Sequence, residues 1–159
     1  MFDEILGLPA HPLIIHFAVV LTPLLVAVAI VYALLPRLRT YVAWAVVLLS
    51  LAAPMAVFAA RQSGESLKAA RFGTAEGEMA ARISTHQSFA NPLLLSVIGL
   101  GVAALLLVYA TSPARDSIGR DRFGRTVTML LAGVTVVLAA VAGYFVFRAG
   151  DSGARAVWS

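Results

Sequence analysis

Long runs of apolar residues alternate with short polar segments along the chain. Four runs, at about 12–35, 41–60, 89–110 and 126–147, each approach the ~20 residues that a helix needs to cross the hydrocarbon of a bilayer. Helices are expected because only a helix satisfies its own backbone in lipid. We expect an outer loop at 61–88, in which AEGEMAARIST forms a short amphipathic helix lying along the interface. The pattern predicts one all-α membrane domain over 1–159, a bundle of four transmembrane helices in two helical hairpins.

Composition supports a membrane location. Of the 159 residues, 60% are hydrophobic and 13% charged, which is more apolar side chain than one soluble core of this size can use. The chain has no cysteine, which excludes disulfides, thiolate metal sites and iron–sulfur clusters held by cysteine. Basic residues lie between the apolar runs and form no basic face, so they argue against a nucleic-acid partner. The lipid bilayer is the expected partner.

Arginine is concentrated in two of the connecting segments. The segments PRLRT (36–40) and TSPARDSIGRDRFGR (111–125) together hold six basic and two acidic residues. The N-terminus, the segment 61–88 and the C-terminal tail together hold six of each. Because short loops rich in Lys and Arg stay in the cytoplasm, both termini are expected to be extracytoplasmic. We expect a multi-pass protein of the bacterial inner membrane.

A weak repeat relates the two halves of the chain. His16 precedes a Pro-Leu-Leu triplet by seven residues, and His86 precedes another by six. The segment ARQSGESLKA (60–69) is echoed by FRAGDSGARA (147–156) after the second and fourth apolar runs. This pattern indicates two hairpins related by a pseudo-twofold axis along the membrane normal, which would place His16 and His86 at equivalent positions.

All three histidines fall on the predicted outer face. His11 and His16 bracket the start of the first run, and His86 precedes the third. Glu65 and Asp151 fall on the same face. On a regular helix His11 and His16 point about 140° apart, so one helix cannot present both to one small ion. His16 lies just within the apolar run, where a polar group normally needs a partner.

Three interpretations of this constellation are open. In the first, His16 and His86 are the axial ligands of a b-type haem that serves electron transfer, and Arg61 and Arg148 pair with its propionates. A porphyrin would then approach the helices at small residues, which are Ala18, Ala27, Ala29, Gly99 and Gly101. The ordinary alternatives are helix packing for the small residues and interfacial anchoring for the arginines.

In the second interpretation, the outer face binds a bare copper or zinc ion. The metal ligands would be drawn from His11, His16, His86, Asp151 and Glu65. In the third interpretation no cofactor is bound, and the chain is a structural or accessory subunit of a larger membrane complex. The apolar runs contain no Asp, Glu, Lys or Arg, which argues against a proton or ion pathway, and no motif indicates an enzyme.

The two ends of the chain together resemble a known family. LPAHPLIIHFAVVLTPL, SGESL, THQSF and GDSGARAVW are similar to the prokaryotic membrane proteins catalogued as domain of unknown function 2231. The resemblance covers nearly the whole chain and implies a four-helix membrane protein. Some members are fused to c-type cytochrome modules, so it also implies respiratory or redox surroundings, with a respiratory complex or cytochrome as partner. It implies no assigned activity.

The opening pattern of the family maps onto His11, His16 and Phe17, and a further family histidine maps onto His86. This chain departs from the pattern at two positions. Many members have proline after the His-Phe pair, where this chain has Ala18. Some have histidine in the closing motif, where this chain has Asp151, and this departure weakens a ligand role at the C-terminal end.

Overall fold

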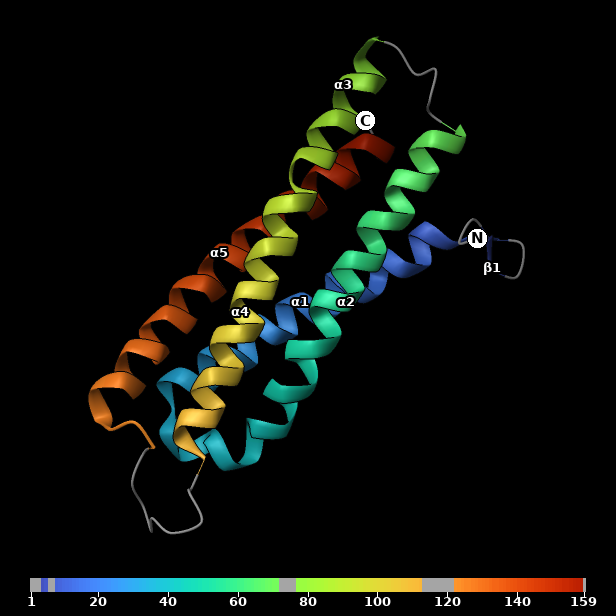
Figure 1. Cartoon of the computed structure of the whole chain (residues 1–159). Coiled ribbons are helices and arrows are strands. Elements are labelled where there is room, and N and C mark those ends of the chain that lie inside the picture. Colours follow the sequence, from blue (N-terminus) through green and yellow to red (C-terminus); the bar gives the residue numbers. More distant parts are fainter. Residues whose placement is uncertain (1–3, 6–7, 72–76, 113–121, 159) are drawn as a thin grey trace.

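The computed structural model contains four long helices that form an elongated bundle (Figure 1). It describes residues 4–5, 8–71, 77–112 and 122–158, and the side chains of 14–69, 77–112 and 122–155. The helices are α1 (Ala10–Leu34), α2 (Arg39–Arg71), α3 (Gly77–Ser88), α4 (Ala90–Thr111) and α5 (Arg125–Trp158). A 3₁₀ turn, η1 (Pro36–Leu38), joins α1 to α2. Two short strands, β1 (Glu4–Ile5) and β2 (Leu8–Pro9), pair antiparallel before α1.

Four helical segments are long and apolar enough to cross a membrane, as the sequence predicts. They are Ile14–Leu34, Pro36–Ala69, Gly77–Thr111 and Arg125–Arg155. The first hairpin is formed by α1 and α2, and the second by α4 and α5. Each hairpin packs against the other through α1 with α5 and through α2 with α4. The helices α1 and α4 therefore occupy diagonal positions in the bundle.

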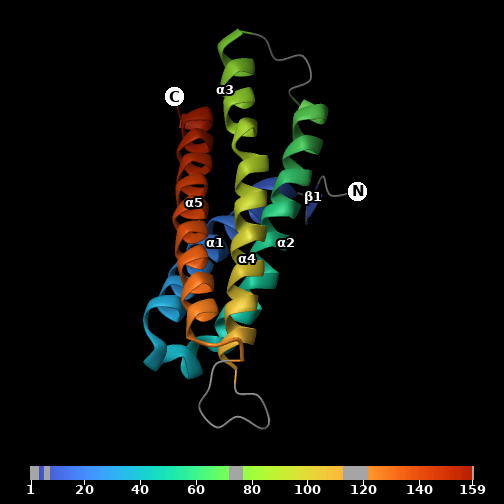
Figure 2. The ribbon, with the colours of Figure 1, turned by 60° about the vertical axis from the view of Figure 1, so that its left-hand side comes forward.

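Most of the segment 61–88, expected as an outer loop with one short helix, is helical. The helix α2 continues to Arg71, and α3 covers Gly77–Ser88. The predicted amphipathic helix exists, but it continues the line of α4 and does not lie across the end of the bundle (Figure 2). The last helix also extends past the predicted end at residue 147, as far as Trp158. Packing of α3 against α5 stabilises the extension of α5 beyond what the local sequence favours.

A continuous apolar seam fills the bundle. On α4, the buried positions recur every three or four residues, at Leu93, Val97, Leu100, Ala104 and Leu107. The same spacing on α1 places Ala18, Thr22, Leu25, Ala29 and Tyr32 inside. This is the periodicity by which one stripe of each helix faces its neighbours. The remaining faces carry the large exposed apolar side chains that a lipid-facing surface requires.

Gly101 allows the two hairpins to approach closely. A Cβ atom built on Gly101 of α4 would lie 2.8 Å from the backbone oxygen of Ser50 on α2. Pro54 of α2 has no N–H to donate to that oxygen, which would be its partner in a regular helix. The Cα–H group of Gly101 therefore packs against a carbonyl that its own helix leaves unpaired.

The bundle has two chemically different ends. We call the end where α1 and α4 finish and α2 and α5 begin the arginine end, because Arg37, Arg39, Arg122 and Arg125 lie there. We call the opposite end, formed by α3 and the C-terminal parts of α2 and α5, the histidine end, because it holds His86.

Candidate functional site

His86 lies between α3 and α5 at the histidine end. Its imidazole Nδ1 is 3.0 Å from the Ser152 hydroxyl, and that hydroxyl donates a hydrogen bond of 3.1 Å to the backbone oxygen of Ala149. When the hydroxyl hydrogen is used in this way, its oxygen can accept an Nδ1–H of His86, and this tautomer leaves a lone pair on Nε2.

A glycine makes room for this imidazole. A Cβ atom on Gly153 would lie 3.1 Å from Cε1 and 3.4 Å from Nδ1 of His86, so the ring rests directly against the backbone of α5. Any larger residue at this position would push the ring away from Ser152. The motif GDSG thus supplies both the hydrogen-bond partner and the space for His86.

Burial keeps this histidine neutral. His86 belongs to α3, a polar helix outside the apolar run of α4, and is half-buried. Desolvation lowers the pKa of its imidazole from the ordinary 6.5, and a backbone hydrogen bond at Ala149 partly opposes this shift. A neutral imidazole with an available nitrogen lone pair can bind a metal ion or accept a proton.

Both predicted arginines lie at the same end. The Arg148 guanidinium stacks over the ring of Phe89, 5.1 Å from its centroid, at the junction of α3 and α4. Arg61 of α2 donates a hydrogen bond of 2.8 Å to the Asn91 side chain and forms an ion pair of 2.8 Å with Glu65. Arg148 is exposed and retains its outer face for an anionic group, whereas Arg61 is held by its neighbours.

The other predicted ligands are placed differently. His16 is exposed on α1, a helix diagonal to α4, and the described interactions of His86 do not include it. Asp151 forms an ion pair of 3.0 Å with Arg155. The side chain of His11 lies outside the described residues. Within the described residues, no three His, Asp or Glu side chains are grouped closely enough to hold a metal ion.

Of the five small residues named as an approach for a porphyrin, four pack between helices and Ala27 is exposed on α1. Ala18 and Ala29 are buried in the seam, and Gly101 packs against Ser50. Gly99 faces the side chain of Leu138 across the α4–α5 contact. Any cofactor held near His86 would therefore lie at the histidine end and not within the apolar seam.

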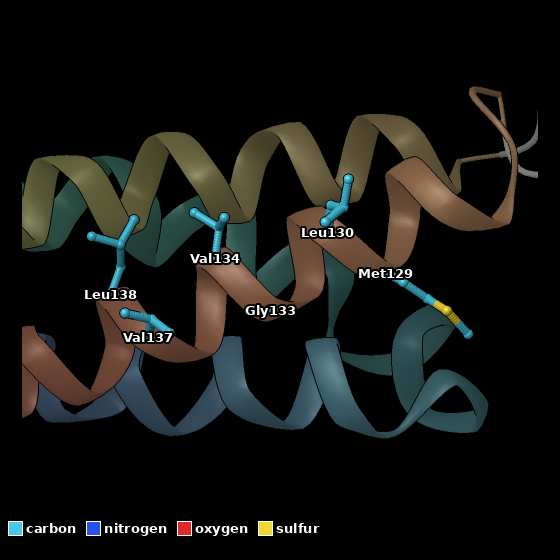
Figure 3. A pocket seen from close by; sticks show the side chains of 6 residues that line it. All are labelled: Met129, Leu130, Gly133, Val134, Val137 and Leu138. Atoms are coloured by element: carbon cyan, nitrogen blue, oxygen red, sulfur yellow. The ribbon is translucent and has the colours of Figure 1, made fainter.

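A hollow on the surface of α5 is separate from this site. It has a volume of about 450 Å³ and lies on the lipid-facing side of α5, where Leu130 and Val134 lean toward α4 (Figure 3). Its lining is wholly apolar: Met129, Leu130, Gly133, Val134, Val137 and Leu138. It offers no nitrogen or oxygen ligand from a side chain.

The family follows from comparison with known proteins. A family model described as a predicted membrane protein, DUF2231, matches residues 7–159. The chain belongs to this family. No curated protein and no solved structure matches the chain. The DUF2231 match includes all of α3 and α5, the two helices that meet at His86.

Sequence reasoning identified His86 but missed its partners. The sequence places Ser152 and Gly153 only in the repeated motif that follows the fourth apolar run. The signal available in the sequence was the echo between ARQSGESLKA and FRAGDSGARA, since both segments are helical extensions at the histidine end.

Proposed function

We propose that this protein binds a metal cofactor at the histidine end through Nε2 of His86, with b-type haem as the first candidate and copper or zinc as the second. The observation that carries the proposal is the hydrogen-bonded chain from His86 through Ser152 to Ala149. Histidine ligands of metals characteristically donate their other N–H in this way, which fixes the ring and its tautomer.

The surrounding residues fit a haem in part. Arg148 is exposed beside Phe89 and can pair with a propionate, and Arg61 of α2 contacts Asn91 at the start of α4. His16 remains the candidate for a second axial ligand. A haem bound here would supply one-electron chemistry, and the chain would hold it by ligation, charge pairing and aromatic contact. We place this function in electron transfer in the bacterial inner membrane, together with a respiratory complex or cytochrome.

A second function is favoured by the same contact. The His86–Ser152 hydrogen bond and the close approach at Gly153 join α3 to α5 without any bound group. In a cofactor-free accessory subunit, this contact would hold the extramembrane helices in the shape that a partner complex recognises.

Visible absorption of the purified protein separates the two functions. A Soret band, with sharp bands on reduction, supports haem, and elemental analysis tests copper and zinc. His86→Ala should abolish the pigment or the bound metal, and Ser152→Ala should weaken binding by about 10–100-fold, because it removes the group that orients the ligand. Pigment that His86→Ala leaves unchanged would refute the ligand, and a colourless, metal-free protein would support the accessory subunit. His16→Ala tests the second axial ligand separately.

A further inference from the structure

The net charge of the chain resides at the arginine end. The formal net charge is +4, from 12 basic and 8 acidic residues. The segments 36–40 and 111–125 carry six basic and two acidic residues, and the rest of the chain is balanced at six of each. The arginine end therefore carries a positive potential that the histidine end lacks.

Two arginines at this end are fixed by the bundle. The Arg39 side chain donates a hydrogen bond of 3.1 Å to the Tyr32 backbone oxygen and lies 5.6 Å from the centre of the Tyr32 ring. The Tyr32 hydroxyl is 2.7 Å from the Thr111 hydroxyl, which ties α1 to α4. Arg122 lies 4.6 Å from the centre of the Tyr109 ring. These contacts close the ends of α1 and α4 and hold the two guanidinium groups in place.

Two other arginines at the arginine end are not held by such contacts within the described residues. Arg37 of η1 and Arg125 at the start of α5 are exposed, and neither has an ion pair or side-chain hydrogen bond within the described residues. The described carboxylates that form ion pairs, Glu65, Glu78 and Asp151, all lie toward the histidine end. Arg37 and Arg125 are therefore available to an external anion.

The same end carries the side chains of a membrane interface. Tyr41 and Trp44 at the start of α2 are 73% and 69% exposed, and Phe123 before α5 is 55% exposed. Aromatic side chains with this exposure are typical of the headgroup level of a bilayer. We therefore expect Arg37 and Arg125 to lie at the depth where lipid phosphates are found.

We propose that Arg37 and Arg125 bind the phosphate of an anionic glycerophospholipid, so that the arginine end selects such lipids from the surrounding bilayer. Guanidinium groups pair well with phosphate, and a basic residue beside an anionic membrane surface adds roughly a five-fold preference. The inference depends on the chain spanning a membrane and is independent of the cofactor proposed for His86.

The chain contains a convenient reporter for this test. It has two tryptophans, Trp44 at the arginine end and Trp158 at the far end of α5. A Trp158→Phe background leaves Trp44 as the only tryptophan, which can be excited selectively over the tyrosines. The protein is reconstituted in vesicles of unbrominated phosphatidylcholine into which brominated phosphatidylglycerol or brominated phosphatidylcholine is titrated. The ratio of the two quenching curves gives the relative affinity of the lipid sites near Trp44.

We expect phosphatidylglycerol to be preferred at low salt, by about five-fold for each arginine. Arg37→Gln and Arg125→Gln should each reduce the preference, and the double variant should bring it close to one. Arg82→Gln, which removes the same charge from the histidine end, should leave it unchanged. High salt should also reduce the preference of the unaltered protein. This test does not depend on the folding of any variant.

Two results would overturn the proposal. One is equal quenching by the two lipids in the unaltered protein. The other is a loss of preference in Arg82→Gln as large as that in Arg37→Gln and Arg125→Gln, which would show that the preference depends on the net charge of the protein alone. Neither result alters the absorption spectrum, so failure here is separable from failure of the cofactor proposal.

Discussion

Replacing Gly101 by alanine should weaken the packing between the two hairpins. The added Cβ atom would lie 2.8 Å from the Ser50 backbone oxygen, whereas ordinary van der Waals contact begins at 3.4 Å. The backbones of α2 and α4 must therefore separate by about 0.6 Å, and neither atom belongs to a flexible side chain. Overpacking of this kind costs about 1–3 kcal/mol.

Gly133 provides a matched control. It is also a mid-helix glycine, but a Cβ atom there would have no neighbour within 4 Å. Both substitutions gain the helix propensity of alanine, about 1 kcal/mol, so the difference between them isolates the steric cost. We expect Gly101→Ala to be less stable than Gly133→Ala by about 1–3 kcal/mol.

Reversible unfolding in mixed detergent micelles, followed by circular dichroism, measures this difference. Both variants should keep the helical content of the unaltered protein in mild detergent, which shows that they fold. A Gly101→Ala variant as stable as Gly133→Ala would refute the close approach of α2 and α4 on which the reasoning depends.

Two further predictions concern buried polar groups. The Thr22 hydroxyl is fully buried and has no hydrogen-bond partner within the described residues. Thr22→Val should therefore raise the free energy of unfolding by about 1–3 kcal/mol in the same assay. A loss of stability would indicate a partner such as a bound water. The pKa of the His86 imidazole is lower in the folded protein than its ordinary 6.5, so protonation favours unfolding. The free energy of unfolding should therefore have its full value above about pH 6.5 and fall as the pH drops below it. His86→Gln should flatten that dependence, and an unchanged pH profile would contradict the burial of the imidazole.

The transmembrane core could be predicted from hydropathy because lipid leaves the chain few choices. An apolar run of about 20 residues without a charge must form a helix, and the short basic segments between runs force hairpins. The structure confirms four such helices and the helical hairpins. The orientation of the termini and the inner-membrane location remain predictions.

The histidine end could not be predicted to the same degree. Residues such as Gly150 and Gly153 lower helix propensity, so the sequence after residue 147 reads as a tail. Contacts with α3 override that preference, and no periodicity in α5 reveals them. His86 was selected for its residue type, but its partner Ser152 lies 66 residues away in the sequence and depends on α3 following the line of α4. Pairing of His16 with His86 remains a prediction.

The last helix is longer than the membrane is thick. At 1.5 Å per residue, the 34 residues of α5 span about 51 Å, whereas a bilayer with its headgroups measures about 40–45 Å. A water-soluble protein that diffuses up to this surface would therefore touch protein before it touches lipid. A protein that docks there would be held at a fixed height above the headgroups, because a helix and not a flexible linker sets that height.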